Sequence, residues 1–212
     1  MSAREEVLLR VRTALRDVPA AERPEDALVP RDYLVREAGA TLERFVERVA
    51  DYGSRVAVAR SDEVPAAVES ACRAFGVSEL LVPTDLPLDW LPPTTSTVPD
   101  AELHVGELDR IGAALTGCAL GIAETGTIIL DGGRGQGRRA LTLVPDVHLC
   151  VIDETQVVEG VPAALRRLSD ELRESRRPLT FISGPSATSD IELSRVEGVH
   201  GPRRFALIVV RS

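Results

Sequence analysis

The sequence predicts one α/β domain with a mostly parallel sheet, preceded by a helical arm. Short apolar runs alternate with amphipathic helical segments from Arg55 onward, which is typical of strands joined by crossover helices. Aromatic residues make up only 3% of the 212 residues, so aliphatic side chains must build the core. This length suits one domain with a substantial core better than two small domains.

The N-terminal forty residues differ from the rest of the chain. Apolar residues recur three or four positions apart from Ala3 to Arg16, which indicates an amphipathic helix. Pro19, Pro24 and Pro30 follow in a stretch without helical periodicity. We therefore assign residues 1–40 to an N-terminal helical arm and linker, and residues 41–212 to the α/β domain.

The first part of that domain predicts a βαβ unit. A helix is expected at Thr41–Tyr52, ended by Gly53. The following elements are a strand at Val56–Ala59, a helix from an N-cap at Ser61 to Phe75 with Gly76 as C-cap, and a strand at Leu80–Val82. Strands joined in this way pair in parallel and bury both faces of the sheet.

A loop and a strand pair are expected next. Proline and threonine are dense from Pro83 to Pro99, which predicts a loop crossing an edge of the sheet and held by Trp90. Two strands with a tight connection are expected at Ala119–Ala123 and Thr127–Leu130. The remaining expected elements are strands at His148–Ile152, Thr180–Ile182 and Phe205–Val210 and a helix at Val161–Leu172. The strand pair is the antiparallel part of an otherwise parallel sheet.

Charge and cysteine content exclude several classes of protein. The net charge of −8 disfavours binding to nucleic acid. We expect a cytoplasmic protein without membrane insertion, because the start is charged and no apolar run has the roughly 18 residues of a membrane helix. The cysteines Cys72, Cys118 and Cys150 are far apart and form no CxxC pair, so we expect core residues and no metal site.

The first candidate site lies between the paired strands. Glycines there permit close approach to a ligand, and exposed N–H groups together with the hydroxyls of Thr125 and Thr127 can bind anionic oxygens beside Gly126. Glu124 is a candidate catalytic base or nucleophile. The alternative is an ordinary β-hairpin turn with its usual glycine and threonine.

A second candidate is the segment Asp131–Arg139, which holds four glycines and three arginines after a strand. Its Gly135-x-Gly137-x-x-Ala140 spacing matches a dinucleotide-binding fingerprint, but no long helix follows, as that motif requires. We interpret it as a mobile loop whose arginines contact an anionic substrate or a partner, with a solvated turn as the alternative.

The third candidate follows the strand at Thr180–Ile182. Ser189-x-x-Glu192 is a capping box that predicts a helix beginning at about Asp190, whose N–H groups would point toward Ser183, Ser186 and Thr188. Such a helix N-terminus binds carboxylate or phosphate. In the turn before the last strand, His200 is a candidate proton acceptor and Arg203 can bind a carboxylate. His104 and His148 are assigned no role, since spacing suggests no partner for either.

Four motifs resemble the LUD-domain lactate-utilisation family, in particular its small C-type subunit. They are Gly121–Thr127, Pro145-x-x-His148, Ser183–Glu192 and Gly198–Pro202. The resemblance implies a three-layer α/β/α sheet of the NagB/RpiA/CoA-transferase-like kind and a role in the oxidation of L-lactate to pyruvate. It also implies two partners, an iron–sulfur LUD subunit and a cysteine-rich subunit, which carry the iron–sulfur clusters, whereas this chain has no cofactor of its own.

Three functions remain open at this point. The first is a subunit of an L-lactate-oxidising complex that holds a small anionic ligand, with Arg203 on its carboxylate and Glu124 or His200 as proton acceptor. The second is a non-catalytic assembly or regulatory module of that complex. The third is a free-standing enzyme acting on phosphorylated or CoA-linked substrates, as relatives of the fold do.

Overall fold

The computed structural model describes residues 2–19, 21–23, 26, 42–188, 196–198 and 200–211. The chain divides into two units, residues 1–35 and residues 36–212. In the first unit, helix α1 (Ala3–Ala14) begins at a capping box in which the Ser2 and Glu5 side chains each accept a backbone N–H. None of the α1 residues is buried.

The second unit contains the remaining elements. Its helices are α2 (Leu42–Asp51), α3 (Val64–Phe75), α4 (Val105–Ile111) and α5 (Val161–Ser175), with short 3-10 helices η2 (Ser61–Glu63), η3 (Leu88–Trp90), η4 (Arg139–Thr142) and η5 (Glu154–Gln156). Its strands are β1 (Arg55–Arg60), β2 (Glu79–Val82), β3 (Ser96–Pro99), β4 (Ala113–Thr116), β5 (Leu120–Ile122), β6 (Thr127–Leu130), β7 (Val147–Asp153), β8 (Val157–Val158), β9 (Thr180–Ile182), β10 (Ala187–Thr188), β11 (Val196–Glu197) and β12 (Arg204–Arg211).

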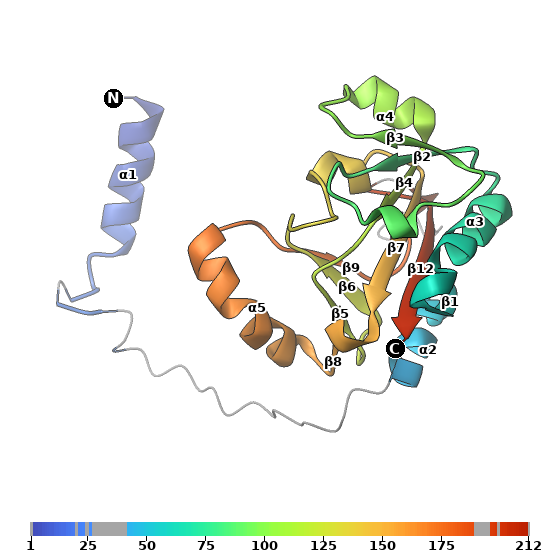
Figure 1. Cartoon of the computed structure of the whole chain (residues 1–212). Helices are drawn as coiled ribbons and strands as arrows, with labels where there is room; N and C mark the ends of the chain where they lie inside the picture. The colour runs from blue at the N-terminus through green and yellow to red at the C-terminus, as the bar shows by residue number, and fades with distance from the viewer. Residues whose placement is uncertain are drawn as a thin grey trace. The chain divides into compact units, whose positions relative to one another are not determined.

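Six strands form a central sheet in the order β1-β12-β7-β4-β2-β3, and every neighbouring pair is parallel. Side chains alternate between its two faces. Helix α3 covers one face, where Val64 and Val68 pack against Leu149 and Ile208. The predicted α/β class with a mostly parallel sheet flanked by helices is confirmed (Figure 1).

The other face of the central sheet supports a second sheet, with the order β8-β5-β6-β9. Strands β5 and β6 form an antiparallel hairpin, and β9 pairs antiparallel with β6. Phe45 and Val49 of α2 are fully buried with this hairpin against β7 and β12. Helix α5 covers the outer face of the second sheet through Ala164 and Leu168, and Figure 1 shows this sheet between the central sheet and α5.

Most predicted elements are confirmed, but the antiparallel strand pair was expected inside the parallel sheet, and it lies instead in a second sheet with β8 and β9. Other differences concern single elements. The end of the predicted Pro83–Pro99 loop is wrong, because Ser96–Pro99 forms the edge strand β3, which tolerates a proline. Trp90 nonetheless packs on the core as expected. Ser61 was expected to cap a helix, but it begins η2, and Glu63 is the N-cap of α3. Helix α4 and strand β4 were not predicted.

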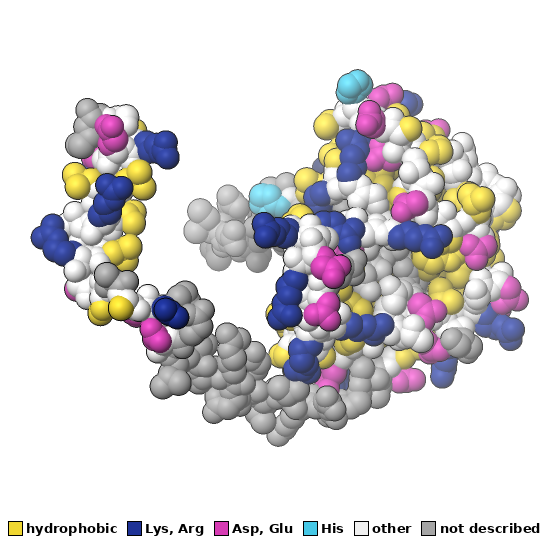
Figure 2. Space-filling view, turned by 60° about the vertical axis from the view of Figure 1, so that its left-hand side comes forward, with side chains coloured by type: hydrophobic (Ala, Val, Ile, Leu, Met, Phe, Trp, Pro, Cys, Tyr) yellow, Lys and Arg dark blue, Asp and Glu magenta, His cyan; other side chains and the backbone are white. Residues whose placement is uncertain are grey.

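Two further findings concern the described helices and one face of the larger unit. None of the described helices is both long and apolar enough to cross a membrane. On the face of the larger unit in Figure 2, basic and acidic side chains are interspersed.

Candidate functional site

The β5–β6 turn is joined to the end of β9 by a chain of hydroxyl groups. The Oγ1 atoms of Thr125 and Thr127 lie 2.7 Å apart, and Thr127 Oγ1 lies 2.8 Å from Ser183 Oγ. Each of these contacts shares one hydrogen between two hydroxyls. Two of the predicted clusters therefore meet at this point, since Thr127 faces Ser183 across the β6–β9 pair.

Two glycines of the predicted clusters make close contacts with α2 and the residue that follows it. Gly126 has φ +61°, and a Cβ there would lie 2.5 Å from the backbone carbon of Arg48. Gly184 has φ +75°, and a Cβ there would lie 2.3 Å from Cβ of Tyr52. Only glycine fits such positions without displacing the helix. The close approach that these glycines permit is thus with α2 for Gly126 and with Tyr52, the residue after α2, for Gly184.

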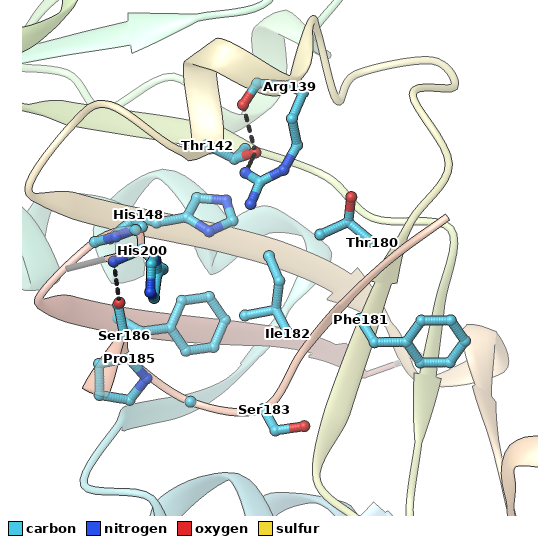
Figure 3. A pocket seen from close by; sticks show the side chains of 14 residues that line it. Arg139, Thr142, His148, Thr180, Phe181, Ile182, Ser183, Pro185, Ser186 and His200 are labelled. Carbon is cyan, nitrogen blue, oxygen red and sulfur yellow. Dashed lines mark hydrogen bonds between the residues drawn. The ribbon is translucent and has the colours of Figure 1, made fainter. Parts of the chain in front are cut away.

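A pocket of about 230 Å³ lies beside Ser183. It is bounded by the amino-terminal ends of β7 and β12, by η4, and by the segments 180–186 and 200–202. Its polar lining consists of Arg139, Thr142, His148, Thr180, Ser183, Ser186 and His200 (Figure 3). The ring of Phe181 points away from this group. The pocket is smaller than the roughly 300–1,000 Å³ typical of drug-sized ligands, which suits a small molecule.

Arg139 supplies the positive charge of the pocket. Its Nη1 donates to Thr142 Oγ1 at 2.9 Å, and partial burial lowers the pKa of the guanidinium, which still stays charged at neutral pH. Within the described part of the chain it forms no ion pair with a carboxylate. The Arg139 guanidinium therefore brings a charged hydrogen-bond donor to the pocket lining.

His148 supplies a neutral imidazole. The side chain is 1% exposed and its ring packs on Phe205 at 5.4 Å. Burial, reinforced by the charge of Arg139, lowers the pKa of His148 to about 3. Its Nε2 lies 2.8 Å from Thr116 Oγ1. At neutral pH this ring therefore carries no charge beside the Arg139 cation.

The wall opposite η4 is built by two segments bound to each other. Ser186 N donates to Pro202 O at 2.8 Å, and Gly198 N donates to Ser186 O at 3.0 Å. The Oγ of Ser186 accepts the backbone N–H of His200 at 3.1 Å. These bonds bring the Ser183–Ser186 motif and the His200 turn together at one pocket, where the Ser186 and His200 side chains lie (Figure 3).

Other candidate residues lie outside the pocket lining. Glu124 is exposed at the hairpin turn, and its backbone N–H bonds to Glu159 O at 2.9 Å. Arg203 is exposed and pairs with Asp146 at 3.4 Å. The backbone of Thr188 belongs to β10, which pairs with β11. Asp190 and the helix predicted to begin there lie outside the described residues.

The Asp131–Arg139 segment, interpreted from the sequence as a mobile loop, is held by side-chain hydrogen bonds in this structure. Gln136 Nε2 donates to Asp131 Oδ1 at 2.6 Å, and Gln136 Oε1 accepts the backbone N–H of Asp131 at 2.9 Å. Asp131 and Gln136 are each 4% exposed. Arg138 is held by both carboxylate oxygens of Asp100, at 2.8 and 2.9 Å. Of the three arginines, only Arg139 lines the pocket.

Metal and cluster binding is not suggested by this chain. Among the described residues, no group of three or more histidine, cysteine and acidic side chains could hold a metal ion. The three cysteines are buried and free, and a cubane iron–sulfur cluster is ordinarily held by four. The residues present do not fit an iron–sulfur cluster.

Two side chains of the pocket lining, Thr142 and His148, were given no role from the sequence, and Arg139 was named only among the arginines of the Asp131–Arg139 segment. Arg139 was one of three arginines in a segment, and nothing in the spacing distinguishes it. His148 lies in a strand pattern in which alternate residues face opposite sides, so a histidine there must face either the α3 layer or the second sheet. That alternation and the place of His148 in the Pro145-x-x-His148 motif were the available signals for it.

Comparison with known proteins decides the family. A family model described as the LUD domain matches residues 100–210, which is more than half of the 212 residues. The chain belongs to the LUD-domain family. The resemblance inferred from the four motifs is confirmed.

Similar LUD proteins include one of nearly the same length. The chain is 45% identical over 208 residues to "Lactate utilization protein C" of Deinococcus radiodurans, covering 97% of this chain and 96% of that protein. It is 34% identical over 113 residues to a protein of the same name from Shouchella clausii, covering 52% of this chain and 49% of that one. A crystal structure of a DUF162 family protein from Deinococcus radiodurans is similar with a TM-score of 0.69 and 40% identity, covering 80% of this chain and 95% of that chain.

Proposed function

We propose that this LUD-family chain acts in lactate utilisation by holding a small 2-hydroxy or 2-oxo carboxylate in the pocket between Arg139, His148 and Ser186. The observation that carries the proposal is the Arg139 guanidinium, which lines a small pocket without a carboxylate partner among the described residues. The name of the relative that is 45% identical supports lactate or pyruvate as the acid. A larger ligand such as CoA would exceed the pocket volume of about 230 Å³.

Each side chain then has a chemical task. Arg139 would bind the carboxylate, because charge-assisted hydrogen bonds to a guanidinium are stronger than neutral ones. The Ser183 and Ser186 hydroxyls would contact the remaining oxygens, and His200 stays a candidate proton acceptor at the pocket rim. Electrons removed from lactate would pass to iron–sulfur clusters in partner subunits, the iron–sulfur LUD subunit and the cysteine-rich subunit, because this chain offers no residues that fit such a cluster.

Calorimetric titration of the full chain with L-lactate and with pyruvate tests the proposal. Arg139→Gln should weaken binding roughly tenfold or more, as expected for the loss of a charge-assisted contact. The matched control is Arg134→Gln, which removes an exposed charge from the same segment outside the pocket lining, and it should leave affinity unchanged.

Two results would contradict the proposal. One is that neither acid binds detectably, and the other is that the wild type and Arg139→Gln bind the acids with equal affinity. Either would favour the assembly role, and reconstitution with the iron–sulfur partners would then be the next assay.

A further inference from the structure

The hydrogen bonds around Thr116 determine which nitrogen of His148 carries the proton. Thr116 Oγ1 lies 2.9 Å from the Gly117 carbonyl oxygen and 2.8 Å from His148 Nε2. A carbonyl oxygen can only accept, so the single hydroxyl hydrogen of Thr116 is directed to Gly117. With its hydrogen directed to Gly117 O, Thr116 Oγ1 accepts a hydrogen from Nε2, and this network assigns the proton of the neutral His148 to Nε2.

The second ring nitrogen is therefore a bare acceptor. Burial and the neighbouring Arg139 keep the ring neutral over the physiological range. No hydrogen-bond donor from the described residues reaches Nδ1, since the hydrogen-bonding contact of the ring is with Thr116. His148 lines the pocket, so a ligand can supply the missing donor.

We propose that His148 Nδ1 accepts a hydrogen bond from the 2-hydroxyl of the bound acid, so that the pocket selects 2-hydroxy acids over 2-oxo acids. This inference rests on the proposed function, because it requires a small carboxylate bound by Arg139. His148 becomes the specificity-determining residue of the site, and Thr116 is the positioning residue that acts through it.

The selectivity follows from donor and acceptor chemistry. A 2-hydroxyl can donate to Nδ1, whereas the oxygen of a 2-oxo group has only lone pairs and would face another lone pair. A site built to bond a substrate hydroxyl discriminates strongly against an analogue that cannot make the bond, because its buried polar atom is left unsatisfied. Oxidation of the bound acid converts the donor into an acceptor, so the same pocket binds the product less tightly than the substrate.

The test compares the same threonine-to-valine substitution at two positions. Thr116→Val removes the group that fixes the His148 proton, and Thr142→Val removes the hydroxyl that contacts Arg139. Each variant of the full chain is titrated calorimetrically with L-lactate and pyruvate at neutral pH. The wild type should bind L-lactate at least roughly tenfold more tightly than pyruvate. Thr116→Val should bring this ratio toward one, whereas Thr142→Val should weaken both acids and preserve the ratio.

A nitrogen NMR spectrum of the unliganded protein gives an independent readout. The chain has three histidines, and the His148 signals are those absent from His148→Gln. They should show protonated Nε2 and bare Nδ1 in the wild type, and a mixture of the two neutral forms in Thr116→Val. Protonation at Nδ1 in the wild type would overturn the assignment.

The binding results separate two kinds of failure. If both acids bind through Arg139 but pyruvate binds as tightly as L-lactate, or if Thr116→Val leaves the ratio unchanged, the role of His148 is wrong and the proposed function stands. If neither acid binds, the proposed function fails and the selectivity fails with it.

Discussion

Mild acid should destabilise this protein through His148. Its pKa is about 3 in the folded chain and about 6.5 in an unfolded chain. Between these values the unfolded chain binds a proton that the folded chain excludes, so the stabilisation is complete above pH 6.5 and is lost progressively as the pH falls toward about 3. From about pH 7 to about pH 5 the free energy of unfolding should fall by about 2 kcal/mol. Most carboxylates remain charged over that interval, which isolates the histidine contribution.

Urea denaturation at several pH values in that interval measures the effect. His148→Gln should remove most of the pH dependence, whatever its own stability. His104→Gln is the matched control, because His104 is exposed, and it should follow the wild type. Arg139→Gln should reduce the slope only in part, because burial is the larger cause of the lowered pKa and the Arg139 charge the smaller. If the free energy of unfolding fell equally with pH in the wild type and in His148→Gln, the reasoning would be refuted.

Two further predictions concern packing and the glycine-rich segment. Gly126→Ala should destabilise the protein by about 2–4 kcal/mol through both its positive φ and its contact with α2. The matched control is Gly132→Ala, at φ +67° with open space around it, which should cost about 1 kcal/mol in urea denaturation. If both variants lost the same free energy of unfolding, the packing argument would be ruled out. Gln136→Ala should cost about 1–3 kcal/mol, because it removes the acceptor of the buried Asp131 backbone N–H. A thermal midpoint unchanged from that of the wild type would show that this network does not hold the segment.

The fold could be predicted where a segment carries its own signals. The α3 region has apolar periodicity and a terminal Gly76 in the left-handed conformation, so its helix and C-cap follow from local chemistry. Strand β3 could not be recognised, because its proline and hydroxyl residues resemble a loop until β2 lies beside it. Helix α4 is seven residues long, too short for a periodic pattern to stand out.

The candidate site was predictable only where its residues are close in sequence or follow a strand. Ser183, Ser186 and His200 lie on turns that adjoin strand ends, and the structure places them at one pocket. The contact between Thr116 and His148 spans 32 positions and depends on β4 lying beside β7, an order that crossovers determine and local patterns do not.

The glycines packed against α2 bear on what a family motif records. Gly126 and Gly184 lie in two of the motifs by which this chain resembles its family, yet Gly126 is required by its approach to α2 and Gly184 by its approach to Tyr52. A descendant that exchanged Arg139 for another side chain would keep both glycines, since their neighbours would still need them. Such a protein would retain the four motifs after its ligand had changed. Arg139 and Thr142, which line the pocket but lie outside the motifs, are therefore the better guide to what each member binds.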